Sequence, residues 1–354
     1  MSKIALASLL LIACSLRAES VVLFAGGGTG PDGGPAIGAK IKIPFAVGFD
    51  KVGNAYIPEF GGDHVRKVDT KGVITTISGN GTKGHTGDGG PASAGTVNWM
   101  HNLVVGPDGN IYIADTGNFC VRKIDLGTGI ISTLAGTGKK GFSGDGGPAT
   151  QAMFGGVFCV AFDAKGEHLY ALDLDNKRVR SIDMKTGIVT TIAGNGKNGV
   201  PANGSDAASS PLADPRAVAA DSKGNVYILE RGGNALRVVD TAGKIHAVAG
   251  TGKSGFSGDG GDALKAELAG PKHIYCDHDD NVLIADTNNH SVRKYTPKDG
   301  KINRIAGTGK SGSAGLNGPP EQLQLSQPHG VYVDAAGTLF ITDSYNDRIL
   351  KIVK

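Results

Sequence analysis

Apolar residues beyond position 20 fall into short clusters separated by polar turns, and the same series of four clusters returns roughly every 57 residues. In each copy, an apolar segment that ends in Asp is followed by a glycine-containing turn and a second segment that ends in a carboxylate. A third segment of the form V-R-K-[VI]-D and a fourth, such as ITTISG or VTTIAG, complete the unit. Short β-branched clusters joined by tight turns predict an antiparallel sheet of four strands in each copy.

Aligning the copies gives columns that vary little. The first segment ends in Asp50, Asp163, Asp221, Asp277 and Asp334, with Gly106 in the second copy. The second segment ends in Glu59, Asp115, Asp173, Glu230, Asp286 and Asp343. The third segment carries Arg66, Arg122, Arg180, Arg237 and Arg293, with Leu350 in the sixth copy. Because a residue that every copy needs is usually structural, we expect the carboxylate and arginine columns to pair and stabilise the fold.

A single four-stranded sheet cannot bury both of its faces, and repeated sheets of this kind stack radially as β-propeller blades. Six copies therefore predict an all-β, six-bladed β-propeller. The sixth copy stops after its third segment, RILKIV, whereas VVLFAG at residues 21–26 matches a fourth segment and precedes the first copy. We expect this N-terminal strand to complete the last blade and close the ring, which removes exposed sheet edges. Residues 21–354 then form one domain.

Composition fits a turn-rich globular protein. Glycine makes up 57 of 354 residues without a period of three, and 40% of the residues are hydrophobic, which excludes a collagen-like or disordered chain. The formal net charge is only +3, and the sequence contains no run of Lys or Arg residues that could follow a phosphate backbone. Nucleic acid is therefore not expected as a partner. A closed propeller needs no partner to cover its edges, and a monomer is expected.

Residues 1–20 have the pattern of a secretory signal peptide, with Lys3 followed by a stretch at residues 4–14 that is apolar except for Ser8. This stretch is too short for a membrane span of about twenty residues, so no transmembrane segment is expected in the mature chain. We expect a secreted or periplasmic protein. The alternative is a lipoprotein anchored to the outer membrane through Cys14, because Leu11 to Cys14 resembles a lipobox. The remaining cysteines, Cys120, Cys159 and Cys276, do not form a disulfide framework.

The segments YIADTGNFCVRKID at residues 112–125 and LIADTNNHSVRKY at residues 283–295 resemble the NHL repeat. The segment TLAGTGKKGFSGDGGPA at residues 133–149 does so as well. The resemblance covers almost everything after the leader and implies a six-bladed propeller of the bacterial exported type. It does not imply one function, because propellers of this kind include protein-binding modules, sensor domains and a few enzymes.

The glycine-rich loops are interpreted as structural. GTGKKG at residues 136–141 and GTGKSG at residues 250–255 suggest phosphate cradles, but no helix is predicted after them and the Walker spacing is absent. Each GDGG turn offers one carboxylate, too few for calcium, and we expect that carboxylate to accept backbone N–H bonds within its turn. These aspartates are Asp88, Asp145 and Asp259.

Function is expected where the blades differ, because a site breaks the rule that the repeat enforces. The column five residues before the first-segment Asp should surround the mouth of the central channel, and it reads Phe45, His101, Phe158, Arg216, Lys272 and His329. The following residues add Asn102 and His273. Aromatic and cationic side chains that converge on one cup favour an anionic or polar ligand. Nearby Trp99 is expected to pack between blades; the alternative is an aromatic residue at the rim that contacts a carbohydrate or a peptide.

His101 and His329 also suggest a metal site, because Pro328-His329-Gly330 resembles the zinc-binding strand starts of the peptidyl-α-hydroxyglycine lyase propeller. That enzyme uses three such histidines, whereas here His273 is one position out of register. The metal-dependent lactonase propellers place carboxylates in this column, which has none here. No nucleophile elbow is present.

We therefore expect an exported binding or interaction module that uses its channel-mouth face to bind a protein, a peptide or a small anionic ligand, without a cofactor and without catalysis. The alternative is a lyase or hydrolase with one divalent metal ion, such as zinc, held by His101 and His329 at the channel. A third possibility is a purely structural component in which the channel is idle.

Overall fold

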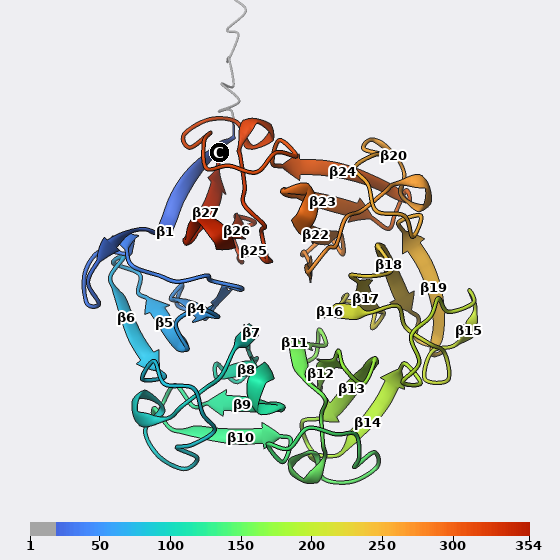
Figure 1. The fold of residues 1–354 in the computed structure, drawn as a ribbon, viewed down its shortest axis with the longest axis horizontal. Helices are drawn as coiled ribbons and strands as arrows, with labels where there is room; N and C mark the ends of the chain where they lie inside the picture. The colour runs from blue at the N-terminus through green and yellow to red at the C-terminus, as the bar shows by residue number, and fades with distance from the viewer. Residues whose placement is uncertain (1–18) are drawn as a thin grey trace, which may run out of the picture.

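A computed structural model describes residues 19–354, and the rest of the predicted leader, with Cys14, lies outside the described residues. Six sheets stand in a ring around a central axis (Figure 1), which confirms the six-bladed β-propeller. Among residues 19–354, no helix is long and apolar enough to cross a membrane.

Each blade is an antiparallel meander whose first strand lies nearest the axis. Blade 1 contains β3 (Gly48–Phe49), β4 (Ala55–Glu59), β5 (His64–Val68) and β6 (Ile74–Ser78). Blade 2 contains β7 (Met100–Val105), β8 (Ile111–Asp115), β9 (Cys120–Ile124) and β10 (Ile131–Ala135). Blade 3 contains β11 (Val157–Phe162), β12 (His168–Asp173), β13 (Arg178–Asp183) and β14 (Val189–Ala193).

Blades 4 and 5 each add a two-residue strand at the outer edge. Blade 4 contains β16 (Pro215–Ala220), β17 (Val226–Glu230), β18 (Ala235–Val239) and β19 (Lys244–Ala249), with β15 (Ser205–Asp206) at its edge. Blade 5 contains β21 (His273–Cys276), β22 (Val282–Asp286), β23 (Ser291–Thr296) and β24 (Lys301–Ala306), with β20 (Gly261–Asp262) at its edge. Blade 6 contains β25 (Gly330–Val333), β26 (Leu339–Asp343) and β27 (Arg348–Val353).

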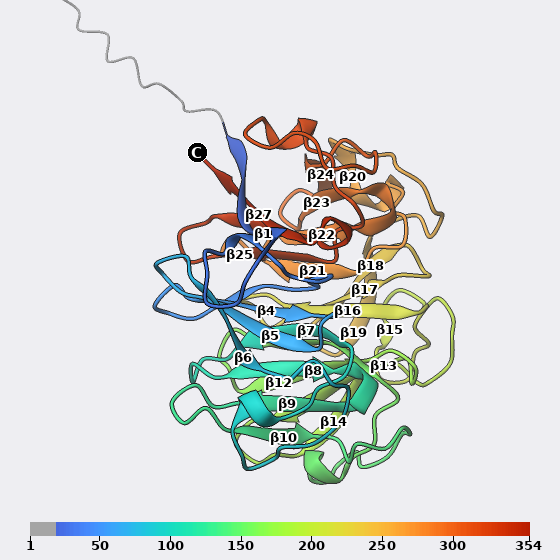
Figure 2. The same cartoon turned by 60° about the vertical axis from the view of Figure 1, so that its left-hand side comes forward.

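The ring closes between the two ends of the described chain. Strand β1 (Ser20–Gly30) pairs antiparallel with β27, from Ser20 opposite Val353 to Gly26 opposite Arg348, and β2 (Ile37–Ala39) lies outside it. Figure 2 shows β1 beside β27. Val21 is fully buried in the apolar cluster that also contains Leu350. The N-terminal strand therefore completes the last blade, as the sequence predicts.

Apolar side chains fill the spaces between adjacent blades. One cluster joins Leu172 of blade 3 to Ile228 of blade 4, and another joins Tyr112 of blade 2 to Phe154, just before blade 3. Each sheet thus buries both faces against its neighbours, which one sheet cannot do alone.

The arginines of the third strands stabilise the blades and the loops between them through ion pairs and hydrogen bonds. Arg66 pairs with Glu59 at 2.7 Å and Arg237 pairs with Glu230 at 2.8 Å, both among buried side chains. The guanidinium of Arg293 also donates to the backbone carbonyls of Glu267 and Ser257, each at 2.9 Å. Three arginines of the column bind the GDGG aspartates at 2.7 to 2.9 Å: Arg122 binds Asp88, Arg180 binds Asp145 and Arg293 binds Asp259. Within residues 19–354, none of the three carboxylates accepts a hydrogen bond from a backbone N–H of its own turn, so that expectation was wrong.

In blade 6, an arginine at a different strand position makes the contacts of the arginine column. Leu350 stands in the aligned column, but Arg348, two residues earlier on β27, donates from Nε to Asp343 at 2.7 Å. Its other nitrogens donate to the carbonyls of Ser313 and Gln324, which repeats the contacts of Arg293. The role is thus present in the sixth blade although the sequence alignment does not show it.

Candidate functional site

Three inner strands begin with a β-bulge at the variable column. The pairing jumps from Met100 to Asn102 in β7, from Val157 to Cys159 in β11 and from Pro215 to Ala217 in β16. The residues passed over are His101, Phe158 and Arg216, so each is the extra residue of a bulge. Because a bulge re-aims the side chain it inserts, these residues leave the alternation of the strand and turn toward the channel mouth.

The six residues of the variable column meet as a ring, called here the channel-mouth ring: Phe45, His101, Phe158, Arg216, Lys272 and His329. The imidazole of His329 stacks on Phe45 with ring centroids 4.0 Å apart and planes 3° from parallel. His101 lies 5.2 Å from Phe45 and 4.4 Å from Phe158 between ring centroids. The Arg216 guanidinium lies over Phe158 at 4.5 Å, and Lys272 Nζ lies 3.1 Å from His329 Nε2.

Arg216 is a buried cation that pairs with no carboxylate among residues 19–354. Its exposed fraction is 5%, and its Nε makes no hydrogen bond within residues 19–354. The nearby carboxylate of Asp214 is bound instead by Arg231, at 2.7 Å. Burial, and then the charge of Arg231, lowers the pKa of Arg216 to about 9, so the guanidinium stays charged at neutral pH. A buried charge in this condition is costly unless an anion compensates it.

Lys272 is the second cation of the ring. Burial, reinforced by Arg216 and Arg231, lowers the pKa of Lys272 to about 8. Its Nζ donates to Nε2 of His329, because Nδ1 of that imidazole donates to the Gln327 carbonyl at 2.8 Å. Burial and the charge of Lys272 hold the pKa of His329 well below its usual value. His329 is therefore a neutral acceptor, and it supplies no negative charge to Lys272.

His101 is fixed in the same tautomer. Its Nδ1 donates to the Trp99 carbonyl at 2.9 Å and lies 3.0 Å from the Thr116 hydroxyl. Burial and then Arg216 hold the pKa of His101 well below its usual value. The ring therefore combines two neutral imidazoles with two cations and two phenyl rings.

Exposed aromatic side chains extend the ring across this face. Phe60 stacks on Phe45 at 4.5 Å and lies 6.3 Å from Trp99, while Tyr345 lies 5.9 Å from His329 on the other side. Trp99 is 47% exposed and Tyr345 is 56% exposed, so the expectation that Trp99 packs between blades was wrong. The left-handed backbone of Trp99, with φ of 52°, and the bond from its N–H to Asp63 at 3.0 Å hold the indole at the rim.

Sequence reasoning missed Phe60 and Tyr345, although a signal was available. Phe60 follows the carboxylate of its blade, where the other blades have Thr116, Leu174, Arg231, Thr287 and Ser344. Tyr345 follows in the next column, where the others have Gly61, Gly117, Asp175, Gly232 and Asn288. Each aromatic residue is therefore an exception within its column, as the ring residues are.

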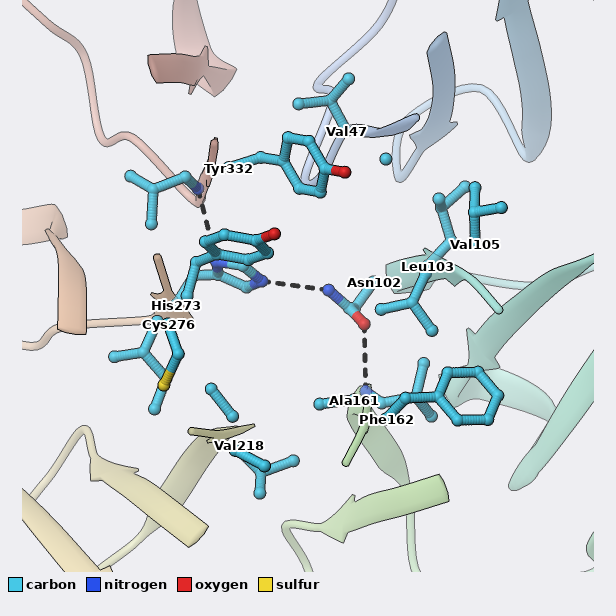
Figure 3. Close-up of a pocket in the computed structure, with 18 residues that line it drawn as sticks. Val47, Asn102, Leu103, Val105, Ala161, Phe162, Val218, His273, Cys276 and Tyr332 are labelled. Atoms are coloured by element: carbon cyan, nitrogen blue, oxygen red, sulfur yellow. Dashed lines mark hydrogen bonds between the residues drawn. The ribbon is translucent and has the colours of Figure 1, made fainter. Parts of the chain in front are cut away.

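Asn102 and His273 lie one layer deeper than the channel mouth. Asn102 Nδ2 is 3.1 Å from His273 Nε2, and this contact joins blades 2 and 5 across the channel (Figure 3). The Val160 N–H donates to Asn102 Oδ1 at 3.0 Å, and the Val331 N–H points at His273 Nδ1 at 3.3 Å. Burial, and then Arg216, lowers the pKa of His273 to about 4.

The ring does not fit a metal ion. Phe45 lies between His101 and His329, and each imidazole has only Nε2 left for a metal, because its Nδ1 donates to a backbone carbonyl. The remaining nitrogen of His329 faces the Lys272 ammonium. Within residues 19–354, no three His, Cys, Asp or Glu side chains gather as a metal-binding group.

Comparison with known proteins points to the same repeat. The NHL repeat profile matches residues 101–124 and 325–352, in blades 2 and 6. The chain is 30% identical over 253 residues to the Arabidopsis thaliana protein SUPPRESSOR OF QUENCHING 1, chloroplastic, with 68% of this chain and 23% of that protein covered. It is 26% identical over 272 residues to the Bos taurus NHL repeat-containing protein 2, with 69% of this chain and 37% of that protein covered. The chain thus corresponds to less than half of either relative.

A similar solved structure is an auxiliary nutrient binding protein from Bacteroides ovatus. Its TM-score is 0.69 at 17% sequence identity, with 95% of this chain and 76% of that chain covered. At this identity the likeness shows a common fold.

Proposed function

The chain is a six-bladed β-propeller of the NHL-repeat family, and from that premise we propose that it is a binding module whose channel-mouth ring holds the anionic group of a small ligand or peptide. The observation that carries the proposal is Arg216, a side chain only 5% exposed that forms no ion pair with any carboxylate in the described part of the chain. Structural arginines elsewhere in the fold each bind a carboxylate, as Arg66 and Arg237 do. A buried cation that lacks such a partner is explained by a ligand that brings one.

Lys272 strengthens this interpretation. The only hydrogen-bond partner of its Nζ among the described residues is the neutral His329, so two cations on neighbouring blades share no counter-charge. A carboxylate or phosphate between them would gain charge-assisted hydrogen bonds from both side chains. Water is partly excluded around them by Phe45 and Phe158, which strengthens such contacts.

The aromatic rim suits a flat or apolar group next to the anion. Trp99 and Tyr345 leave about half of their surfaces exposed on either side of the ring, and Lys83 Nζ lies 4.4 Å above the indole. Exposed aromatic rings beside a positive cup are typical of sites for acidic peptides and acidic sugars. The ligand class we propose is therefore a peptide or sugar with at least one carboxylate.

The proposed setting is outside the cytoplasm, as a monomer. The predicted leader supports export, and the Bacteroides ovatus propeller of similar fold carries the name of an auxiliary nutrient binding protein. A role in capturing a nutrient or a peptide in the periplasm or at the cell surface agrees with both.

Isothermal titration calorimetry of the purified chain with acidic peptides and uronic acids tests the proposal. Arg216→Met and Lys272→Met are expected to weaken binding at least about tenfold, because each removes a charge-assisted bond. Lys301→Met, on the outer strand β24, is a matched control that should bind like the native chain. Failure of every carboxylate probe to bind, or equal binding by all three variants, would overturn the proposal.

A further inference from the structure

Asn102 and His273 also line a cavity of about 230 Å³, and none of the six residues of the channel-mouth ring is in its lining (Figure 3). We call it the inner cavity. Its lining includes Val104, Ala161, Ala219, Tyr275 and Tyr332. Tyr275 and Tyr332 pack together with ring centroids 4.8 Å apart. More of its wall is apolar than polar, and it is distinct from the ring described above.

The polar part of the inner cavity is a chain of four groups across the channel: the Val160 N–H, the Asn102 amide, the His273 imidazole and the Val331 N–H. All four residues line the cavity. Both ends of the chain are backbone donors. Between them, the Asn102 amide presents an NH₂ group that donates on one side and an oxygen that accepts on the other, and a neutral imidazole has one donor and one acceptor.

No assignment of protons pairs every contact in this chain. If Asn102 Oδ1 accepts from Val160, its NH₂ faces His273 Nε2, so Nδ1 must carry the proton and meets the Val331 N–H donor to donor. The other tautomer moves the conflict to Asn102, and the other amide orientation moves it to Val160. Protonation of His273 adds a further donor. These four groups are therefore one acceptor short in every protonation state and amide orientation, and an unpaired buried N–H is costly.

A ligand oxygen at this position would supply the missing acceptor. The nearby charge of Arg216, which also disfavours protonation of His273, makes the local potential positive and favours an anionic oxygen over a neutral one. An apolar cavity of about 150 Å³ accepts benzene. The volume here, about 230 Å³, is sufficient for one ring with a carboxyl group.

We propose that the inner cavity is a second binding site, which takes a small carboxylic acid with an aromatic or branched apolar body. The ligand carboxylate accepts hydrogen bonds from the Val331 N–H and the His273 imidazole. The apolar part of the ligand lies against the apolar walls and the two tyrosines. This inference goes beyond the channel-mouth site, since its ligand is too small to reach the ring past the Asn102–His273 contact.

Fluorine NMR of the whole chain with 4-fluorobenzoate and with 4-fluorobenzyl alcohol tests the site. The acid is expected to bind at least about fivefold more tightly than the alcohol, since hydrogen bonds to a charged acceptor are stronger. Ala161→Phe should abolish binding of the acid by filling the cavity. Ala219→Leu, a smaller change, serves the same purpose if the first variant does not fold.

Lys272→Met distinguishes this site from the channel mouth. It should leave 4-fluorobenzoate binding unchanged while it weakens the acidic peptides at the ring. Loss of benzoate binding in Lys272→Met would assign the acid to the ring and overturn the inference. Equal affinity for acid and alcohol, no binding of either, or acid binding that survives both cavity-filling variants would overturn it as well.

Discussion

Lys272 Nζ lies 3.1 Å from His329 Nε2, and the other nitrogen of that imidazole is fixed by the Gln327 carbonyl. The imidazole therefore presents only an acceptor to the ammonium and cannot carry a charge of its own without repelling it. Lys272 gains a hydrogen bond from this contact but no neutralising charge. The positive charge of Lys272 therefore remains available to a ligand. Because the pKa of Lys272 is about 8, this charge is lost as the pH rises above 8.

Anion binding at the channel-mouth ring should weaken as the pH rises through about 8. Lys272 is charged below its pKa of about 8 and neutral above it, whereas Arg216 keeps its charge until about pH 9. Calorimetric affinity for an acidic peptide, measured at several pH values from 6.5 upward, should therefore fall in two steps. Lys272→Met should remove the first step. An affinity independent of pH in the native chain would contradict the role of Lys272.

Without ligand, Lys272→Met should raise the melting temperature at neutral pH by roughly 1–3 °C, because the native ammonium is held in a partly buried, positive environment. The folded-state pKa near 8 lies below the usual lysine pKa of 10.5, so the unfolded chain binds more protons between these two pH values. The contribution of Lys272 to the free energy of unfolding of the native protein thus rises with pH between about 8 and 10.5. The advantage of the variant should shrink as the pH rises from 8 toward 10. Lys301→Met should show no such trend.

Arg216→Met should also stabilise the ligand-free protein, by at least about 1 kcal/mol, because methionine fills similar space without an uncompensated charge. Denaturant unfolding would measure this change. The same variant is expected to lose the carboxylate ligand, so gain of stability and loss of binding should occur together. Destabilisation by Arg216→Met would indicate that Arg216 is a structural residue, held by its contact with Phe158.

Much of the fold could be predicted from the sequence because every blade buries its two faces with similar residue types at the same positions of the repeat. The repeat period, the six blades and the closure of β27 by β1 all follow from that regularity. The moved arginine could not be found in this way, since Arg348 performs its role from a strand position two residues away from the column.

The candidate site was predicted in outline only. The convergence of Phe45, His101 and His329 follows from their shared column. The depth of Asn102 and His273 does not, because simple alternation along a strand would send neighbouring residues to opposite faces. The bulge at His101 breaks that alternation, and a bulge has no clear sequence signature here.

Arg348→Met should lower the free energy of unfolding by about 3 kcal/mol, since it leaves the buried carboxylate of Asp343 without its cation. The carbonyls of Ser313 and Gln324 lose their donors as well. Lys351→Met, on the same strand and partly exposed, is the control and should change stability little. Urea unfolding of both variants measures the difference. Equal stability of the two would show that the sixth blade does not depend on its displaced arginine.

Removal of the closing strand should open the ring. A chain that begins at residue 27 lacks the segment from Ser20 to Gly26 that pairs with β27, and it loses Val21 from the cluster around Leu350. Strand β27 then becomes an exposed edge, which favours association of copies through edge pairing. We expect a lower melting temperature and higher-order species in size-exclusion chromatography. A chain that begins at residue 19 keeps every pair of β1 with β27 and should melt like the full chain. A monomeric protein with unchanged melting after the longer deletion would show that five complete blades hold the sixth in place without its outer strand.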